Sequence, residues 1–208
     1  MPIDWLEDKE DYSCLPDSSW EAFSDGLRLS QVGAFQHCRW QSRALSAGRL
    51  GFTTSVDVEL SDREVAGEQS WVGFTFGWSE GRSHGLSAGV TATGHVFVGK
   101  HDEYNEFDLP DKFRIEARGI TARDHKYYVF LEVFRPSGRM IGQWISPVEP
   151  SWLEGTVALT VSNQLPPLIV PWEAPPAILP SVNSTTAKTG WLANFDNWVF
   201  YGERVDIR

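Results

Sequence analysis

The chain has 208 residues, of which 41% are hydrophobic, 13% aromatic and 22% charged, as in a globular protein with a packed core. Its formal net charge is −10 and its lysines and arginines are scattered, so we expect no nucleic-acid partner and no binding to anionic membrane surfaces. No apolar run approaches the ~18 residues of a transmembrane helix, so no membrane insertion is expected either.

The first residues leave the localisation open. Met1–Trp5 is acidic and has neither the basic nor the apolar region of a signal peptide. We expect either a cytoplasmic protein or an extracellular one whose leader has been removed from this sequence.

The beginning of the chain predicts an arm followed by strands. Residues 1–25 lack a strand pattern and are expected to form an N-terminal arm, with a short helix that starts near Asp17. Two strands are predicted next, over Gly26–Val32 and Ala34–Leu45. A single domain is expected over residues 26–208.

Strict alternation of apolar and polar residues begins at Phe52. One face of this strand is predicted to carry Phe52, Thr54, Val56, Val58 and Leu60. In the next strand, Trp71–Trp78, one face has Val72, Phe74, Phe76 and Trp78, and the other has Trp71, Gly73, Thr75 and Gly77. Each strand therefore has two chemically different faces, as in a sheet that packs on a second sheet.

Further strands follow at short, regular intervals. They are predicted over Gly85–Thr91, His95–Val98, Phe113–Ala117, Tyr127–Phe134, Met140–Ile145, Gly155–Ser162 and residues 192–201. The total of about eleven strands, with no long helix, predicts an all-β fold in which two antiparallel sheets form a sandwich. Residues 164–190 hold six prolines and are expected to form a Pro-rich insertion in this domain.

The two cysteines, Cys14 and Cys38, allow two interpretations. They are either unrelated free thiols or a disulfide that ties the N-terminal arm to an early strand. The second interpretation requires an oxidising compartment, which the sequence does not establish.

Four segments occur in an order that resembles concanavalin A-like jelly rolls, which include laminin-G-like domains and the sandwiches of family 16 glycoside hydrolases. They are Ala47–Phe52, Lys112–Ala117, the hairpin Tyr127–Trp144 and the closing segment Phe195–Gly202. The resemblance implies a two-sheet jelly roll. The hairpin and the closing segment also resemble, more weakly, the accessory sandwich domain of some alkaline-phosphatase-D-type metallophosphatases.

The jelly-roll resemblance implies a structural Ca²⁺ site. In many such domains an aspartate on the closing strand helps to bind the ion together with backbone carbonyls near the early strands. Asp196 matches the aspartate by position, and Gly51 is the candidate for the carbonyl. Both would supply the oxygen ligands that Ca²⁺ prefers.

Candidate ligand-binding residues follow from the strand faces. Trp71 shares a face with Gly73 and Thr75, so an aromatic ring would lie beside a surface of small residues. Sugars stack on such rings while polar groups bind their hydroxyls. Trp144, with Gly142 on its face, is a second candidate, and ordinary core packing is the alternative for both tryptophans.

Catalytic residues are harder to assign. Family 16 glycosidases carry three acids at alternate positions of one strand, whereas Asp57 and Glu59 are followed by Ser61. Glu132, between Phe130 and Phe134, is the other acid in an aromatic setting. We therefore expect a non-catalytic module that binds carbohydrate or serves as an accessory domain to a catalytic partner. A glycoside hydrolase or polysaccharide lyase and a structural interaction domain are the alternatives.

Overall fold

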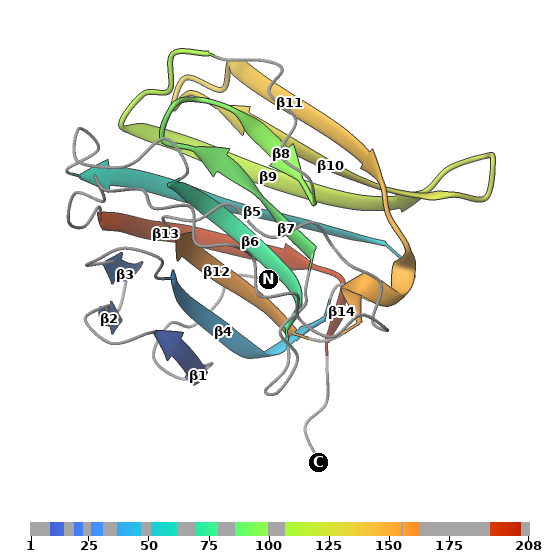
Figure 1. Ribbon diagram of the computed structural model, residues 1–208, viewed down its shortest axis with the longest axis horizontal. Helices are drawn as coiled ribbons and strands as arrows, with labels where there is room; N and C mark the ends of the chain where they lie inside the picture. The colour runs from blue at the N-terminus through green and yellow to red at the C-terminus, as the bar shows by residue number, and fades with distance from the viewer. Residues whose placement is uncertain are drawn as a thin grey trace, which may run out of the picture.

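The protein is described by a computed structural model for residues 9–14, 19–22, 26–30, 37–46, 51–61, 70–78, 86–99, 107–154, 156–162 and 192–204. Within these residues, strands β1–β14 form two sheets and Pro150–Leu153 forms a single 3₁₀ turn, η2. The sheets lie face to face as a sandwich (Figure 1). The predicted all-β, two-sheet antiparallel fold is confirmed.

One sheet, here called the β6 sheet, has the order β1-β4-β12-β6-β7-β8, and β14 adds to β4. All of its pairings are antiparallel. Its strands are β1 (Lys9–Cys14), β4 (His37–Ser46), β6 (Trp71–Trp78), β7 (Leu86–Thr91), β8 (Val96–Val98), β12 (Thr156–Ser162) and β14 (Glu203–Arg204).

The other sheet, here called the β5 sheet, has the order β11-β10-β9-β5-β13-β3-β2 and is also antiparallel. Its strands are β2 (Ser19–Ala22), β3 (Gly26–Ser30), β5 (Phe52–Ser61), β9 (Lys112–Thr121), β10 (Tyr127–Phe134), β11 (Met140–Pro147) and β13 (Leu192–Tyr201). The predicted closing strand thus lies inside a sheet, between β5 and β3.

The N-terminal segment differs from its prediction. Instead of an arm with a short helix near Asp17, Lys9–Cys14 forms β1 and Ser19–Ala22 forms β2. These short edge strands carry little alternation of their own, and pairing with β4 and β3 determines their conformation. The predicted Pro-rich insertion at 164–190 lies outside the described residues.

The core lies between the two sheets and is rich in aromatic rings. Between the sheets, Phe76 of β6 meets Phe52 and Phe74 meets Trp198, with ring centroids 4.8 and 6.5 Å apart. Within the β5 sheet, Phe200 stacks on Phe52 at 6.1 Å. Aliphatic side chains from both sheets fill the space around them. Such aromatic pairs stabilise a core by more than the burial of their apolar surface alone would.

The alternation of inward-facing and outward-facing side chains reverses part-way along strand β13. Ala193 and Phe195 are buried, and so are Trp198 and Phe200, which breaks the period of two. A β-bulge between Asp196 and Val199, with Asn197 at φ +50°, supplies the extra residue. The bulge brings the Trp198 ring into the core, because one added residue reverses the alternation.

No helix in the part of the chain that the structure describes is long and apolar enough to cross a membrane.

Candidate functional site

The face of the β6 sheet that points away from the sandwich core has an unusual composition. Val72, Phe74 and Phe76 of β6 belong to the core, so Trp71, Gly73 and Thr75 lie on the opposite face. The strand register adds the remaining members of this outer face: Ser87, Gly89, Thr91, Phe97, Ala158 and Thr160. On β6, β7, β8 and β12, the described residues of this face other than the two aromatic ones are Gly, Ala, Ser and Thr.

The two aromatic residues contact each other at one end of this face. The rings of Trp71 and Phe97 meet edge to face, with centroids 5.3 Å apart. A Cβ atom on Gly89 would lie 2.7 Å from the Trp71 ring, so only glycine leaves room for the indole here. Glycine at this position therefore lets the indole lie against the backbone of β7.

Two hydroxyl groups meet on the same face. Thr75 Oγ1 and Thr160 Oγ1 are 2.8 Å apart, and both residues are buried. Two hydroxyls have two protons, but a mutual hydrogen bond uses only one of them. The pair therefore keeps one further O–H donor and several acceptor lone pairs, with no other protein partner among the described residues.

Both sides of the β6 sheet are closed to solvent at these strands. Trp71 and Thr75 are each 1% exposed, and every residue of β7 is buried. In the β5 sheet, by contrast, buried and partly exposed residues alternate along β5 and β10. The predicted pair Trp71 and Thr75 thus lies together on one face, and that face is covered.

Trp144 is not part of this face. It lies on β11 in the β5 sheet, opposite Leu131, and is half-buried against the core. The structure therefore separates the two tryptophans that the sequence offered as ligand-binding residues.

Sequence reasoning missed the members of this face on β7, β8 and β12, among them Ser87, Phe97 and Thr160. The alternation along β12 could have assigned Thr160 to the face opposite the core, because Ala158 and Thr160 alternate with Val157, Leu159 and Val161. Pairing of β12 beside β6 could not be read from the sequence, since long stretches of chain separate the two strands.

The predicted calcium ligands are far apart, which corrects the proposed pairing of Asp196 with Gly51. Asp196 is the direct cross-strand partner of Asp57, and Gly51 lies six positions before Asp57, next to the first residue of β5. At about 3.3 Å per residue this is a separation of roughly 20 Å. Among the described residues, no group of three His, Cys, Asp or Glu side chains could hold a metal ion.

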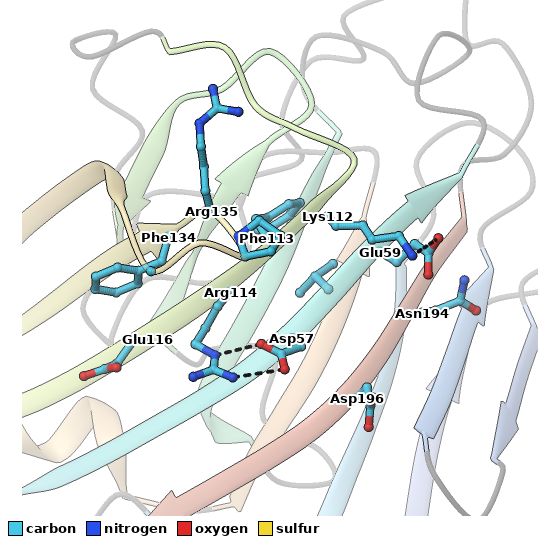
Figure 2. A pocket seen from close by; sticks show the side chains of 13 residues that line it. Asp57, Glu59, Lys112, Phe113, Arg114, Glu116, Phe134, Arg135, Asn194 and Asp196 are labelled. Carbon is cyan, nitrogen blue, oxygen red and sulfur yellow. Dashed lines mark hydrogen bonds and ion pairs between the residues drawn. The ribbon is translucent and has the colours of Figure 1, made fainter.

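The outer face of the β5 sheet carries a shallow charged groove, shown in Figure 2. Arg114 donates two hydrogen bonds to Asp57, of 2.7 and 3.1 Å, and Lys112 Nζ lies 3.0 Å from Glu59 Oε1. Both pairs join β9 to β5 at directly opposite positions. Such exposed cross-strand pairs contribute modestly to sheet stability.

The pKa of Asp57 shows how this ion pair acts. Partial burial alone would raise the pKa of the carboxyl group. The hydrogen bonds from Arg114 and Asn197 and the positive charge of Arg114 outweigh that effect, so the pKa lies below its usual value. Asp57 is therefore ionised and held in place, which suits a structural role better than proton transfer.

No protein-family model and no curated protein matches the chain. Solved structures do match it over nearly their whole length. Endo-β-1,4-glucuronan lyase from the fungus Trichoderma reesei has a TM-score of 0.56 at 8% identity, with 97% of this chain and 94% of that one covered.

Two plant proteins are similar to the same extent. Lectin I from Ulex europaeus, in complex with the methyl glycoside of α-L-fucose, has a TM-score of 0.55 at 11% identity, covering 95% of this chain and 94% of that one. Arcelin-5 from Phaseolus vulgaris, a lectin-like defence protein, has a TM-score of 0.53 at 10% identity, covering 98% and 95%. The chain has the concanavalin A-like fold.

A concanavalin A-like sandwich does not by itself distinguish a lectin from a lyase. The acids considered from the sequence lie on the outer face of the β5 sheet. Glu132 is 3.3 Å from Arg118 and 3.4 Å from Gln143 Nε2, and Asp57 and Glu59 are paired as described above. Each of the three carboxylates thus has a cationic partner.

The outer face of the β6 sheet has a different chemistry in this concanavalin A-like protein. Its described residues on β6, β7, β8 and β12 include no carboxylate. A glycosidase needs one carboxyl group to donate a proton and a second one to attack the sugar or activate water. On these four strands the described residues of the face therefore offer binding groups and no acid pair.

Proposed function

We propose that the protein is a non-catalytic carbohydrate-binding module whose sugar site is the outer face of the β6 sheet around Trp71, Thr75 and Thr160. The observation that carries the proposal is the combination of an aromatic ring with a hydroxyl pair whose second O–H has no partner among the described residues. A sugar ring presents an apolar face for the indole and hydroxyls for the threonines. The other residues of this face on β6, β7 and β12 have small side chains.

This site requires a conformational step before binding. Trp71 and Thr75 are each 1% exposed, so a sugar reaches them only when the face opens. Association that waits for such a change is slower than the usual 10⁵–10⁷ M⁻¹s⁻¹. We expect an association rate constant below about 10⁵ M⁻¹s⁻¹.

A glycan array followed by titration of the best ligand tests the proposal. Trp71→Ala should weaken binding at least about tenfold, equivalent to about 1.4 kcal/mol. Thr75→Val, which keeps the shape and removes the hydroxyl, should weaken it less. Trp144→Phe is the matched control, because Trp144 lies on the other sheet, and it should leave affinity unchanged. Thermal unfolding of each variant separates lost binding from lost folding.

Two results would overturn the proposal. One is a ligand whose affinity is the same in Trp71→Ala and Thr75→Val as in the wild type. The other is turnover, seen as reducing sugar or unsaturated uronate, that disappears in Glu59→Gln or Glu132→Gln. Turnover of that kind would make the protein a glycoside hydrolase or polysaccharide lyase.

Calcium binding at Asp196 is a subsidiary proposal, with Asp57 in place of Gly51 as its partner. The two carboxylates are direct cross-strand neighbours, and Asn197 Nδ2 lies 3.0 and 3.2 Å from them. A cation would have to compete with Arg114 for Asp57. At a hundredfold excess over its dissociation constant it would add about 2.7 kcal/mol of stability, lost on EDTA treatment and absent from Asp196→Asn.

A further inference from the structure

The two cysteines of the chain are neighbours in the β6 sheet. Strand β1 pairs with β4, and in that pairing Cys14 and Cys38 are direct Cα partners. A residue in an antiparallel sheet has at most one direct partner on each neighbouring strand. The only two cysteines in 208 residues therefore occupy one of the few arrangements in which they can be bridged.

The backbone spacing of such a pair suits a disulfide. Directly opposite residues in an antiparallel pair have Cα atoms about 4.5 or 5.5 Å apart, depending on their hydrogen bonding. Disulfides join residues whose Cα atoms are about 4.4–6.8 Å apart. Either kind of pair meets this requirement without movement of the strands.

The chain between the two cysteines passes through both sheets. It leaves the β6 sheet after β1, forms β2 and β3 at the end of the β5 sheet, and returns to the β6 sheet as β4. These strands share one end of the sandwich (Figure 1). A bond between Cys14 and Cys38 would close a ring of about 25 residues around that end.

We propose that Cys14 and Cys38 form a disulfide that fastens this end of the sandwich. Among the described strands, β1 and β2 lie at sheet edges, and each pairs with one neighbour. Edge strands have few partners to prevent fraying. The cross-link joins β1 to β4 covalently. It also closes the segment that contains β2 and β3 into a loop, which lowers the conformational entropy of that segment in the unfolded chain.

The bond forms by exchange with a small-molecule disulfide such as oxidised glutathione. One cysteine thiolate attacks this disulfide, which gives a mixed disulfide and releases one thiol. The second cysteine thiolate then attacks the protein sulfur of the mixed disulfide and releases a second thiol. Two electrons pass from the two cysteines to the small disulfide, and the released thiols take up the two protons.

The test is made on the full chain after equilibration with oxidised glutathione. Thiol titration in denaturant should find no free cysteine, and a non-reducing peptide map should join the peptides that contain Cys14 and Cys38. Reduction with dithiothreitol should lower the melting temperature by roughly 5–15 °C. It should also speed limited proteolysis near the N-terminus.

Control variants separate the cross-link from other effects of reductant. Cys14→Ser/Cys38→Ser should melt at the temperature of the reduced wild type and should not respond to dithiothreitol. Two titratable thiols, a glutathione adduct on each cysteine, or a dimer linked between chains would each overturn the proposal. The peptide map of the wild type decides the question even if the double variant does not fold.

Discussion

At the scale of single residues, Tyr127 has a buried hydroxyl group that lowers the stability of the folded protein. The residue is 4% exposed, and its Oη has no hydrogen-bond partner in the described part of the chain. The phenol reaches Gly119, where an added Cβ would collide with both Oη and the Phe52 ring. A buried hydroxyl without a partner loses hydration and receives nothing in exchange.

Tyr127→Phe should therefore leave the protein equally stable or make it up to about 1 kcal/mol more stable. Urea unfolding at neutral pH measures this difference. A loss of more than about 1 kcal/mol would contradict the expectation, because it would show that the hydroxyl has a partner after all.

The pH dependence of the same variant provides a second check. Burial raises the pKa of Tyr127 from 10.0 to about 12. Between these values the unfolded chain releases the phenolic proton and the folded chain keeps it, so stability falls as the pH rises. The wild type should lose stability more steeply than Tyr127→Phe between pH 10 and 12.

At the scale of elements, the bulge in β13 decides which residues form the core. Asp196 and Asn197 are both exposed, and Trp198 then enters the core. Its indole Nε1–H donates to Thr54 Oγ1 at 2.8 Å, and the threonine hydroxyl donates in turn to the Val199 carbonyl at 3.1 Å. This short chain of hydrogen bonds joins β13 to β5 inside an otherwise apolar layer.

Thr54→Val keeps the shape of the side chain but removes both hydrogen bonds. We expect a loss of about 1–3 kcal/mol in the free energy of unfolding, because the indole N–H and the Val199 carbonyl lose these partners in a buried site. Thr54→Ser retains the hydroxyl and serves as the control. Equal losses in the two variants would attribute the effect to packing instead.

At the scale of the whole molecule, β13 holds the β5 sheet together. It lies between β5 and β3; it pairs with β5 over most of its length and with β3 over Leu192–Asp196. Both partners precede it by more than a hundred residues, so these contacts form only after a long loop closes. Slow, non-local pairing of this kind is typical of all-β sandwiches.

A chain ending at Gly190 should therefore lack a cooperative thermal unfolding transition by circular dichroism. A peptide of residues 191–208, added in trans, should restore the transition, because it supplies the missing strand. The same peptide with Trp198→Asp should not. A truncated chain that unfolds cooperatively by itself would show that the sandwich does not need β13.

The local sequence pattern was sufficient to predict a strand and its buried residues where one face of the strand is buried and the other is open. In β5 and β10 the buried and exposed positions alternate as the sequence predicts, since each side chain's environment follows from the pleat alone. The sandwich architecture could be predicted for the same reason. The position of Trp71 on β6 also followed, because Val72, Phe74 and Phe76 defined the opposite side.

Only the tertiary structure decided the rest, because it depends on which strands become neighbours. Local pattern did not predict β1 and β2, whose partners β4 and β3 determine their conformation. Pairing also brought Thr160 to Thr75 and Asp57 to Asp196, and it placed Gly51 far from the latter. Sequence reveals which side of a strand is apolar, whereas register and sheet order determine which side chains meet.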